Sequence, residues 1–196
     1  MNLLGKNISA NLLSNLWLTV LLLSLTPLYI WLLGVESYGL IGFYLSWVAI
    51  LAILDMGISA TVVREIAWRT AQLDAKGTVP SLVRSLEVTY WGIILTLGAC
   101  ILTGAWFFGA GWFQAETLQP EEIRNALMLM AVSLVTQVPS GLYIGGLMGL
   151  QRQVECSGLV ALFGTLRGLG SILVLWFISP DIHTFFLWQI VASIIQ

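Results

Sequence analysis

The stretch LLSNLWLTVLLLSLTPLYIWLL, from Leu12 to Leu33, contains no charged side chain. A transmembrane helix needs about 20 consecutive, mainly apolar residues, and this stretch is long enough. A secretory signal peptide has a shorter apolar region of about 7–15 residues and then a small-residue cleavage site. No such cleavage site follows Leu33. The stretch therefore predicts a first transmembrane helix that stays in the mature protein.

The composition extends this prediction to the whole chain. Of its 196 residues, 58% are hydrophobic and 9% are charged, and the mean hydropathy is +0.92. Soluble domains carry about 25% charged residues, so this chain has too few to cover a water-facing surface. The net charge of −2, without a basic stripe, argues against nucleic acid as a partner. We therefore expect an integral membrane protein with membrane lipids around it.

Further apolar runs follow the first one, each bounded by Gly, Pro or charged residues. They cover about residues 38–63, 88–108, 123–150 and 156–178, and a last run from about 184 to Gln196. Only helices and closed barrels satisfy all backbone groups within a bilayer, and the alternation of barrel strands is missing here. The sequence predicts an all-α, polytopic membrane protein: one bundle over residues 1–196 with about six transmembrane helices, the sixth cut short.

The basic residues predict the orientation. If the helices alternate in direction, six of the eight fall on one side, and the positive-inside rule then places the N-terminus in the cytoplasm. We expect a multi-pass protein of the plasma membrane. The basic side carries Lys6, Arg64, Arg69, Lys76, Arg84 and Arg152. The opposite side carries Glu36, Glu116, Glu121, Glu122 and Asp181, together with Arg124.

Polar residues within the spans are candidates for a site, because each is unfavourable in hydrocarbon. In the first span they share one side of the helix: Asn11, Ser14, Asn15, Thr19 and Thr26. In the fourth they follow i, i+3, i+4, i+7 spacing, which is one helix face: Ser133, Thr136, Gln137 and Ser140. These faces either line a water-filled cavity or form helix–helix hydrogen bonds of about 1 kcal/mol or less per pair. Asn11, Asn15 and Gln137 are the candidate cavity residues.

Arg167 lies near the middle of the fifth span. An unpaired arginine at that depth costs at least ~2.5–3.5 kcal/mol, so it needs a wet cavity or an anionic partner. One hypothesis is that Arg167 faces an internal cavity and attracts an anionic headgroup; the other is an ion pair with Asp55 or another acidic side chain. Asp55 itself is either an ion-coupling site or a structural partner of a nearby arginine.

Small residues and prolines predict how the helices pack. Gly141, Gly145 and Gly149 repeat at the spacing that allows close helix approach. Pro27 and Pro139 lie within spans and predict kinks.

The usual signatures of catalysis are missing from the sequence. His183 is the only histidine, and neither a phosphate-binding loop nor a GxGxxG motif occurs. Cys100 and Cys156 read as buried, inert thiols. We expect no enzyme, no catalytic residue, no metal and no cofactor.

Three motifs resemble those of polysaccharide (O-antigen type) flippases. LGVESYGL at 33–40 is similar to the family's turn between its first two helices. LDMGI at 54–58 with VREIA at 63–67, and GLMGLQR at 146–152, are similar to its next two signatures. The superfamily also holds lipid II flippases and multidrug and toxin extruders.

The resemblance implies one six-helix bundle, the N-terminal lobe of a two-bundle exporter with a cationic cavity between the lobes. It implies that the protein flips an undecaprenyl-diphosphate-linked glycan across the bacterial inner membrane, for polysaccharide, lipopolysaccharide or O-antigen biosynthesis. Arg64 and Arg167 would be cavity cations. Family members have about twice as many helices, so a second lobe or a homodimer is the expected partner. An ion-coupled small-molecule extruder and a non-transporting membrane subunit are the alternatives.

Overall fold

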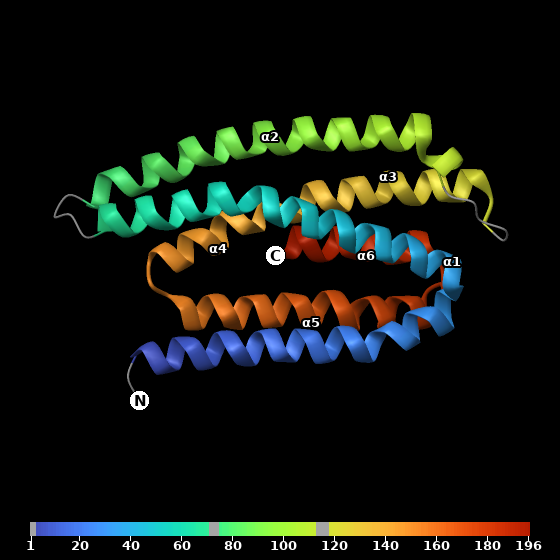
Figure 1. Cartoon of the computed structure of the whole chain (residues 1–196), viewed down its shortest axis with the longest axis horizontal. Coiled ribbons are helices and arrows are strands. Elements are labelled where there is room, and N and C mark those ends of the chain that lie inside the picture. Colours follow the sequence, from blue (N-terminus) through green and yellow to red (C-terminus); the bar gives the residue numbers. More distant parts are fainter. Residues whose placement is uncertain (1–2, 71–74, 113–117) are drawn as a thin grey trace.

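The computed structural model describes residues 3–70, 75–112 and 118–196, and within them the side chains of residues 5–53, 59–68, 70, 84–107 and 118–196. Every regular element in these ranges is an α-helix (Figure 1). The helices are α1 (Leu3–Thr70), α2 (Ala75–Trp112), α3 (Pro120–Gln137), α4 (Ser140–Gly149), α5 (Gln153–Phe177) and α6 (Ile182–Ile195). The prediction of an all-helical protein is confirmed.

Four helical stretches in the described part of the chain are long and apolar enough to cross a membrane. They are Gly5–Ile53, Arg84–Phe107, Pro120–Gly149 and Gln153–Phe177. The sixth predicted span corresponds to α6, a shorter apolar helix of 14 residues. The first two predicted spans both belong to α1, which has non-helical backbone angles at Gly34 between them. These lengths and compositions indicate a membrane-embedded helical protein.

The chain reverses direction within α1, at Gly34 (Figure 1). Gly34 has φ 80° and ψ 168°, a region that is essentially restricted to glycine because a Cβ atom would clash there. It divides α1 into a first arm (residues 3–33) and a second arm (residues 35–70). The Glu36 carboxylate accepts a hydrogen bond of 3.2 Å from the backbone N–H of Leu118, which ties the reversal to the start of α3.

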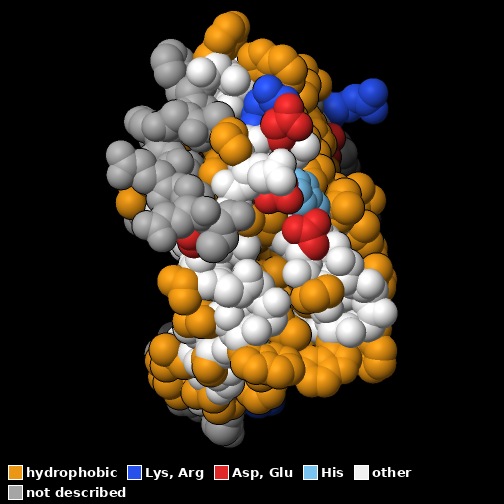
Figure 2. Space-filling view, turned by 90° about the vertical axis from the view of Figure 1, so that its right-hand side faces the viewer, with side chains coloured by type: hydrophobic (Ala, Val, Ile, Leu, Met, Phe, Trp, Pro, Cys, Tyr) orange, Lys and Arg blue, Asp and Glu red, His pale blue; other side chains and the backbone are white. Residues whose placement is uncertain are grey.

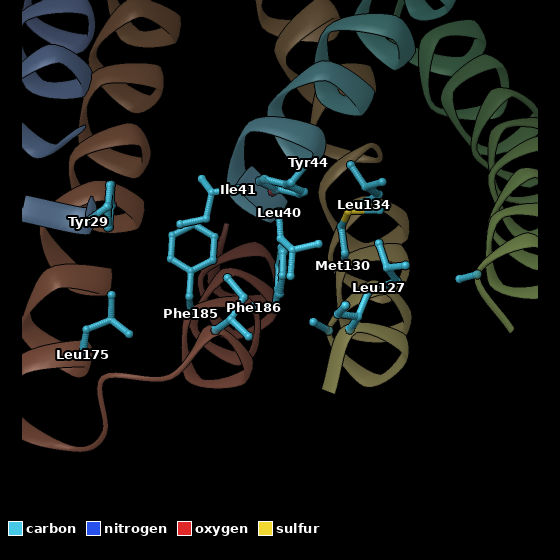
Figure 3. Packing of buried hydrophobic residues seen from close by; sticks show 14 of the residues in the cluster. Tyr29, Leu40, Ile41, Tyr44, Leu127, Met130, Leu134, Leu175, Phe185 and Phe186 are labelled. Atoms are coloured by element: carbon cyan, nitrogen blue, oxygen red, sulfur yellow. The ribbon is translucent and has the colours of Figure 1, made fainter. Parts of the chain in front are cut away.

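The helices pack in pairs around α6. The first arm of α1 lies along α5, the second arm lies against α4, and α3 packs between α2 and α6 (Figure 1). A large hydrophobic cluster, the main cluster, joins buried residues of both arms, α3 and α6, with Ala105 of α2 and Leu175 of α5. Phe185 and Phe186 of α6 lie at its centre (Figure 3). The Phe185 ring meets Tyr29 edge-on at 5.6 Å between centroids, and the Phe186 ring meets Tyr44 at 5.6 Å.

A second, smaller cluster lies apart from the main one. It consists of Val62, Ile66, Tyr90, Ile94 and Leu142, and we call it the end cluster. It joins the second arm of α1 to α2 and α4. The hydrophobic interior is therefore divided into two parts along the length of the bundle.

The glycines of α4 lie against the second arm of α1. A Cβ atom on Gly149 would lie 3.0 Å from the Val63 carbonyl oxygen and 3.0 Å from Ile66 Cβ. One on Gly145 would lie 3.5 Å from the Ser59 carbonyl oxygen. The GxxxG spacing thus acts here in helix packing. Gly141, the first glycine of the row, borders a cavity instead.

Several helix boundaries differ from the apolar runs. The polar stretch 64–87 is largely helical, since α1 continues to Thr70 and α2 begins at Ala75. The fourth run is two helices rather than one, because Pro139 separates α3 from α4. α1, in contrast, passes through Pro27 without non-helical backbone angles there. An apolar run marks only the part of a helix that suits hydrocarbon, and the helix itself continues into the polar residues on either side.

Most basic residues lie at one end of the bundle, which also carries Glu65, Glu87 and Glu155. The chain's start, the end of α1 and the α4–α5 connection lie at one end; the Gly34 reversal and the α2–α3 and α5–α6 connections lie at the other (Figure 1). We call these the basic and the acidic end, and Figure 2 shows acidic side chains on the latter. The basic end carries Lys6, Arg64, Arg84 and Arg152, and the acidic end carries Glu36, Glu121, Glu122, Arg124 and Asp181. The side chains of Arg69, Lys76 and Glu116 lie outside the described residues.

Replacing Gly34 with alanine should destabilise the fold. The backbone angles at Gly34 would strain an alanine by about 1–3 kcal/mol. Gly39 offers a matched control, because nothing lies within 4 Å of a Cβ atom there and its φ is not positive. In thermal unfolding in detergent, Gly34→Ala should lower the midpoint and Gly39→Ala should leave it unchanged or raise it. Equal midpoints for the two variants would contradict a strained reversal.

A large side chain at Gly149 should disrupt the contact between α4 and α1. Overpacking of this kind typically costs about 1–3 kcal/mol. Gly92 of α2, which is exposed and has nothing within 4 Å of a Cβ atom, is the control. The melting midpoint should fall for Gly149→Leu and not for Gly92→Leu; a Gly149→Leu protein as stable as the wild type would show that the close contact is absent.

Candidate functional site

A partly open cavity of about 250 Å³ lies between the two arms of α1 and is bordered by α3, α5 and α6. Leucines of the first arm form much of its wall, namely Leu18, Leu21, Leu22 and Leu25. Its polar lining residues are Tyr29, Tyr44, Gln137, Arg167 and Gln189. An apolar wall with a few polar groups that converge is typical of a ligand site. We refer to it as the Arg167 cavity.

Arg167 reaches the cavity from α5 and is only partly satisfied. Its Nη2 atom donates a hydrogen bond of 2.6 Å to Gln196 Oε1, whereas its Nη1 atom is buried and has no hydrogen-bond partner. Among the described side chains, no Asp or Glu pairs with it. A buried charged donor without an acceptor is unfavourable by about 1–3 kcal/mol or more. The side chain of Asp55, the alternative partner, lies outside the described residues.

Tyr44 and Gln137 form a hydrogen-bonded pair in the same cavity. The Tyr44 hydroxyl donates to Gln137 Oε1 at 2.6 Å, which links the second arm of α1 to the last residue of α3. Tyr44 is buried, and its hydroxyl lies close to the Arg167 guanidinium. The uncharged Tyr44 hydroxyl and Gln137 amide therefore lie on the same cavity wall as the positively charged Arg167 guanidinium.

Gln189 completes the polar lining from α6, where it is buried. Neither Tyr44 nor Gln189 was predicted as a site residue. An amide within the sixth apolar run is a signal that could have identified Gln189. Nothing comparable marks Tyr44, because tyrosine is common in apolar runs and only the fold places it opposite Arg167.

The contact between α5 and the first arm fixes the position of Arg167 on the cavity wall. Gly164 and Gly168 of α5 let the leucines of the first arm approach closely; a Cβ atom on Gly168 would lie 2.8 Å from Leu25 Cδ1. The Tyr29 hydroxyl lies 2.5 Å from Ser171 Oγ and donates to the Gly168 carbonyl at 3.1 Å. A neighbouring helix thus makes the close approach on this side of α5, and Arg167 projects into the space beside it.

The other predicted cavity residues lie elsewhere. Arg64 is exposed on the second arm and does not line the Arg167 cavity. Asn11 and Asn15 are exposed on the first arm, where Asn15 Nδ2 donates to Asn11 Oδ1 at 2.8 Å. The structure therefore brings together Arg167 and Gln137 of the predicted set, and it leaves Arg64, Asn11 and Asn15 outside.

The hydroxyl groups of the predicted polar faces bond to their own helices. The Ser14, Thr19 and Thr26 hydroxyls donate to the carbonyls of Asn11, Asn15 and Leu22. Those of Ser133, Thr136 and Ser140 donate to carbonyls three or four residues earlier. Such local bonding is common for serine and threonine in helices. One face of a helix can therefore be rich in hydroxyls without lining a cavity.

Residues with metal-binding or redox chemistry do not contribute to the cavity. No group of three or more His, Cys, Asp or Glu that could hold a metal occurs among the described residues. His183 lies at the acidic end, where its Nδ1 atom is 2.8 Å from Asp181 Oδ2. Cys156 is buried, but Cys100 is exposed, contrary to expectation, because it lies on an outward face of α2.

Comparison of the chain with protein-family models, curated proteins and solved structures finds no match to any of them. The resemblance of the three motifs to polysaccharide flippases remains a prediction.

Water should reach the Arg167 cavity but not the outer face of the first arm. Leu22 lines the cavity and is 48% exposed, whereas its neighbour Leu23 is 69% exposed and does not line it. With Cys100 and Cys156 replaced, Leu22→Cys should react much faster than Leu23→Cys with a charged, membrane-impermeant maleimide in lipid nanodiscs, because thiolates form and react in water. Equal protection of the two cysteines would mean a dry cavity.

Proposed function

We propose that this chain is one six-helix lobe of an exporter that flips an undecaprenyl-diphosphate-linked glycan across the bacterial plasma membrane. The two arms of α1 support a count of six spans: with the reversal at Gly34, the arms cover residues 3–33 and 35–70, and a single crossing needs about 20. α2, the α3–α4 pair, α5 and α6 would supply the other four. The three motifs at 33–40, 54–67 and 146–152 support the same assignment.

The partly satisfied Arg167 is the observation that carries the proposal. A guanidinium with a buried, unpartnered Nη1 atom in a 250 Å³ cavity offers a site for an anionic oxygen. Arginine suits phosphate because its planar fork matches two phosphate oxygens. Tyr44, Gln137 and Gln189 offer uncharged groups that can form hydrogen bonds with sugar hydroxyls. A lipid-linked diphosphate with a glycan attached contains both chemistries.

The charge distribution supports a cytoplasmic N-terminus. Lys6, Arg64, Arg84 and Arg152 belong to the basic end, and positively charged connections usually remain in the cytoplasm. The acidic end would then face the opposite side of the membrane. In this orientation the substrate would enter the cavity from the basic end.

A partner lobe follows from the charge of the substrate. A diphosphate carries more than one negative charge, and the cavity contains one arginine among its lining residues. A second lobe or a second copy of the chain would add further cations around the headgroup.

Replacing Arg167 should abolish most of the transport. In membrane vesicles containing the native assembly, we expect Arg167→Ala to reduce flipping by roughly 10- to 100-fold, since a hydrogen bond to a charged group contributes about 1.5–3 kcal/mol. Arg167→Lys should retain part of the activity. Flipping is measured as the exposure of the glycan to a membrane-impermeant sugar-modifying enzyme.

Arg152 supplies the matched control. It is exposed in the α4–α5 connection and forms an ion pair with Glu155, so Arg152→Ala should leave flipping unchanged. Unchanged flipping in Arg167→Ala would eliminate the role of Arg167. Absence of flipping in the wild-type assembly itself would favour a non-transporting membrane subunit.

A further inference from the structure

The break between α3 and α4 lies within a stretch long and apolar enough to cross a membrane, Pro120–Gly149. Pro139 has no backbone N–H, so the Val135 carbonyl cannot receive its usual helical hydrogen bond. After the break the chain forms tighter turns: the Gly141 N–H donates to the Val138 carbonyl at 3.1 Å. The Ser140 hydroxyl donates to the Gln137 carbonyl at 2.8 Å.

A side chain from another helix also bonds to the broken segment. The Tyr90 hydroxyl of α2 donates to the Val138 carbonyl at 3.3 Å. Tyr90 is buried within the end cluster. At 3.3 Å this bond is long for an O–H donor, whose usual distance to oxygen is about 2.7–2.8 Å. It is therefore a weak connection between α2 and the break.

The two halves of the broken helix belong to different packing groups. α3 packs against α2 and α6 in the main cluster, whereas α4 packs against the second arm of α1 through Gly145 and Gly149. Leu142 of α4 belongs to the end cluster. Val138, at the break, is the residue that packs against both clusters. The boundary between the two hydrophobic clusters thus lies within about one turn of the break, since Val135 of α3 also packs against the end cluster.

Space is available next to the break. A cavity of about 140 Å³ is lined by Gln137, Val138, Ser140 and Gly141 on one side, and by Val48 and Leu51 of α1 on the other. This pocket is open to the outside of the bundle, and it lies beside a break in the backbone hydrogen bonds. It gives α4 room to change its angle to α3.

We propose that Val138–Pro139 is a pivot about which α4 tilts relative to α3, and that the Tyr90–Val138 hydrogen bond acts as its latch. Gln137 precedes the pivot and lines both the 140 Å³ cavity and the Arg167 cavity. Tilting α4 therefore moves Ser140 and Gly141, which line the 140 Å³ cavity together with Gln137. The pivot is a property of the fold and stands apart from what the Arg167 cavity binds.

Distances between spin labels test the pivot directly. One pair of labels spans the break, at the exposed positions Asn125 of α3 and Met148 of α4. The control pair, Val154 and Leu173, lies on the uninterrupted α5. Both pairs are placed in protein without Cys100 and Cys156, in lipid nanodiscs, and the distances are measured by double electron–electron resonance. The variants are Pro139→Ala, which restores the missing N–H, and Tyr90→Phe, which removes the hydroxyl group of the latch.

We expect a broader distance distribution across the break than along α5. Pro139→Ala should narrow it, and Tyr90→Phe should shift or broaden it while the control pair stays unchanged. A wild-type distribution as narrow as the control, and unaffected by Tyr90→Phe, would overturn the proposal, and this criterion holds even if Pro139→Ala does not fold. A broad distribution that Tyr90→Phe leaves unchanged would overturn the role of the latch.

Discussion

The reversal of α1 at Gly34 is the constraint on which the rest of the structure depends. It turns a helix of 68 residues into two arms, so that one can pack against α5 and the other against α4. The space between the arms is occupied by α6 and, beyond it, by the Arg167 cavity. A straight helix would leave α5 and α4 on unrelated surfaces, and no cavity would form. The backbone angles that permit the reversal are accessible to glycine because it lacks a Cβ atom.

The Arg167 cavity shows how tight packing can create an unsatisfied group. Gly164, Gly168 and Ser171 bring α5 close to the first arm, and the Tyr29 hydroxyl bonds both Ser171 and the Gly168 carbonyl. The half-buried guanidinium extends into the cavity beside this contact. Arg167 is held facing Tyr44 and Gln137, with one nitrogen buried and without an acceptor. An acceptor for this nitrogen would remove the unfavourable free energy of the arrangement.

The candidate site could be predicted only in part, for a physical reason. Helical periodicity places residues on a common face, and it did so for Gln137 and for the hydroxyls around it. Periodicity does not say with which group a side chain bonds. Serine and threonine reach the carbonyls of their own helix, whereas the longer amide of Gln137 extends to Tyr44. The Asn11 and Asn15 side chains form a hydrogen bond with each other because they are one turn apart on an exposed face.

The sequence by itself determined that the chain is helical and suited to a membrane, since long apolar runs leave the backbone no other way to satisfy its hydrogen bonds there. It also marked Gly34 and Pro139 as places for a turn or a break, but it marked Pro27 equally, and there the backbone stays helical. The tertiary structure decided which helices become neighbours, and so which polar groups share the cavity. Tyr44, Gln137, Arg167 and Gln189 come from four different helices. Their proximity depends on long-range packing, which no local pattern in the sequence records.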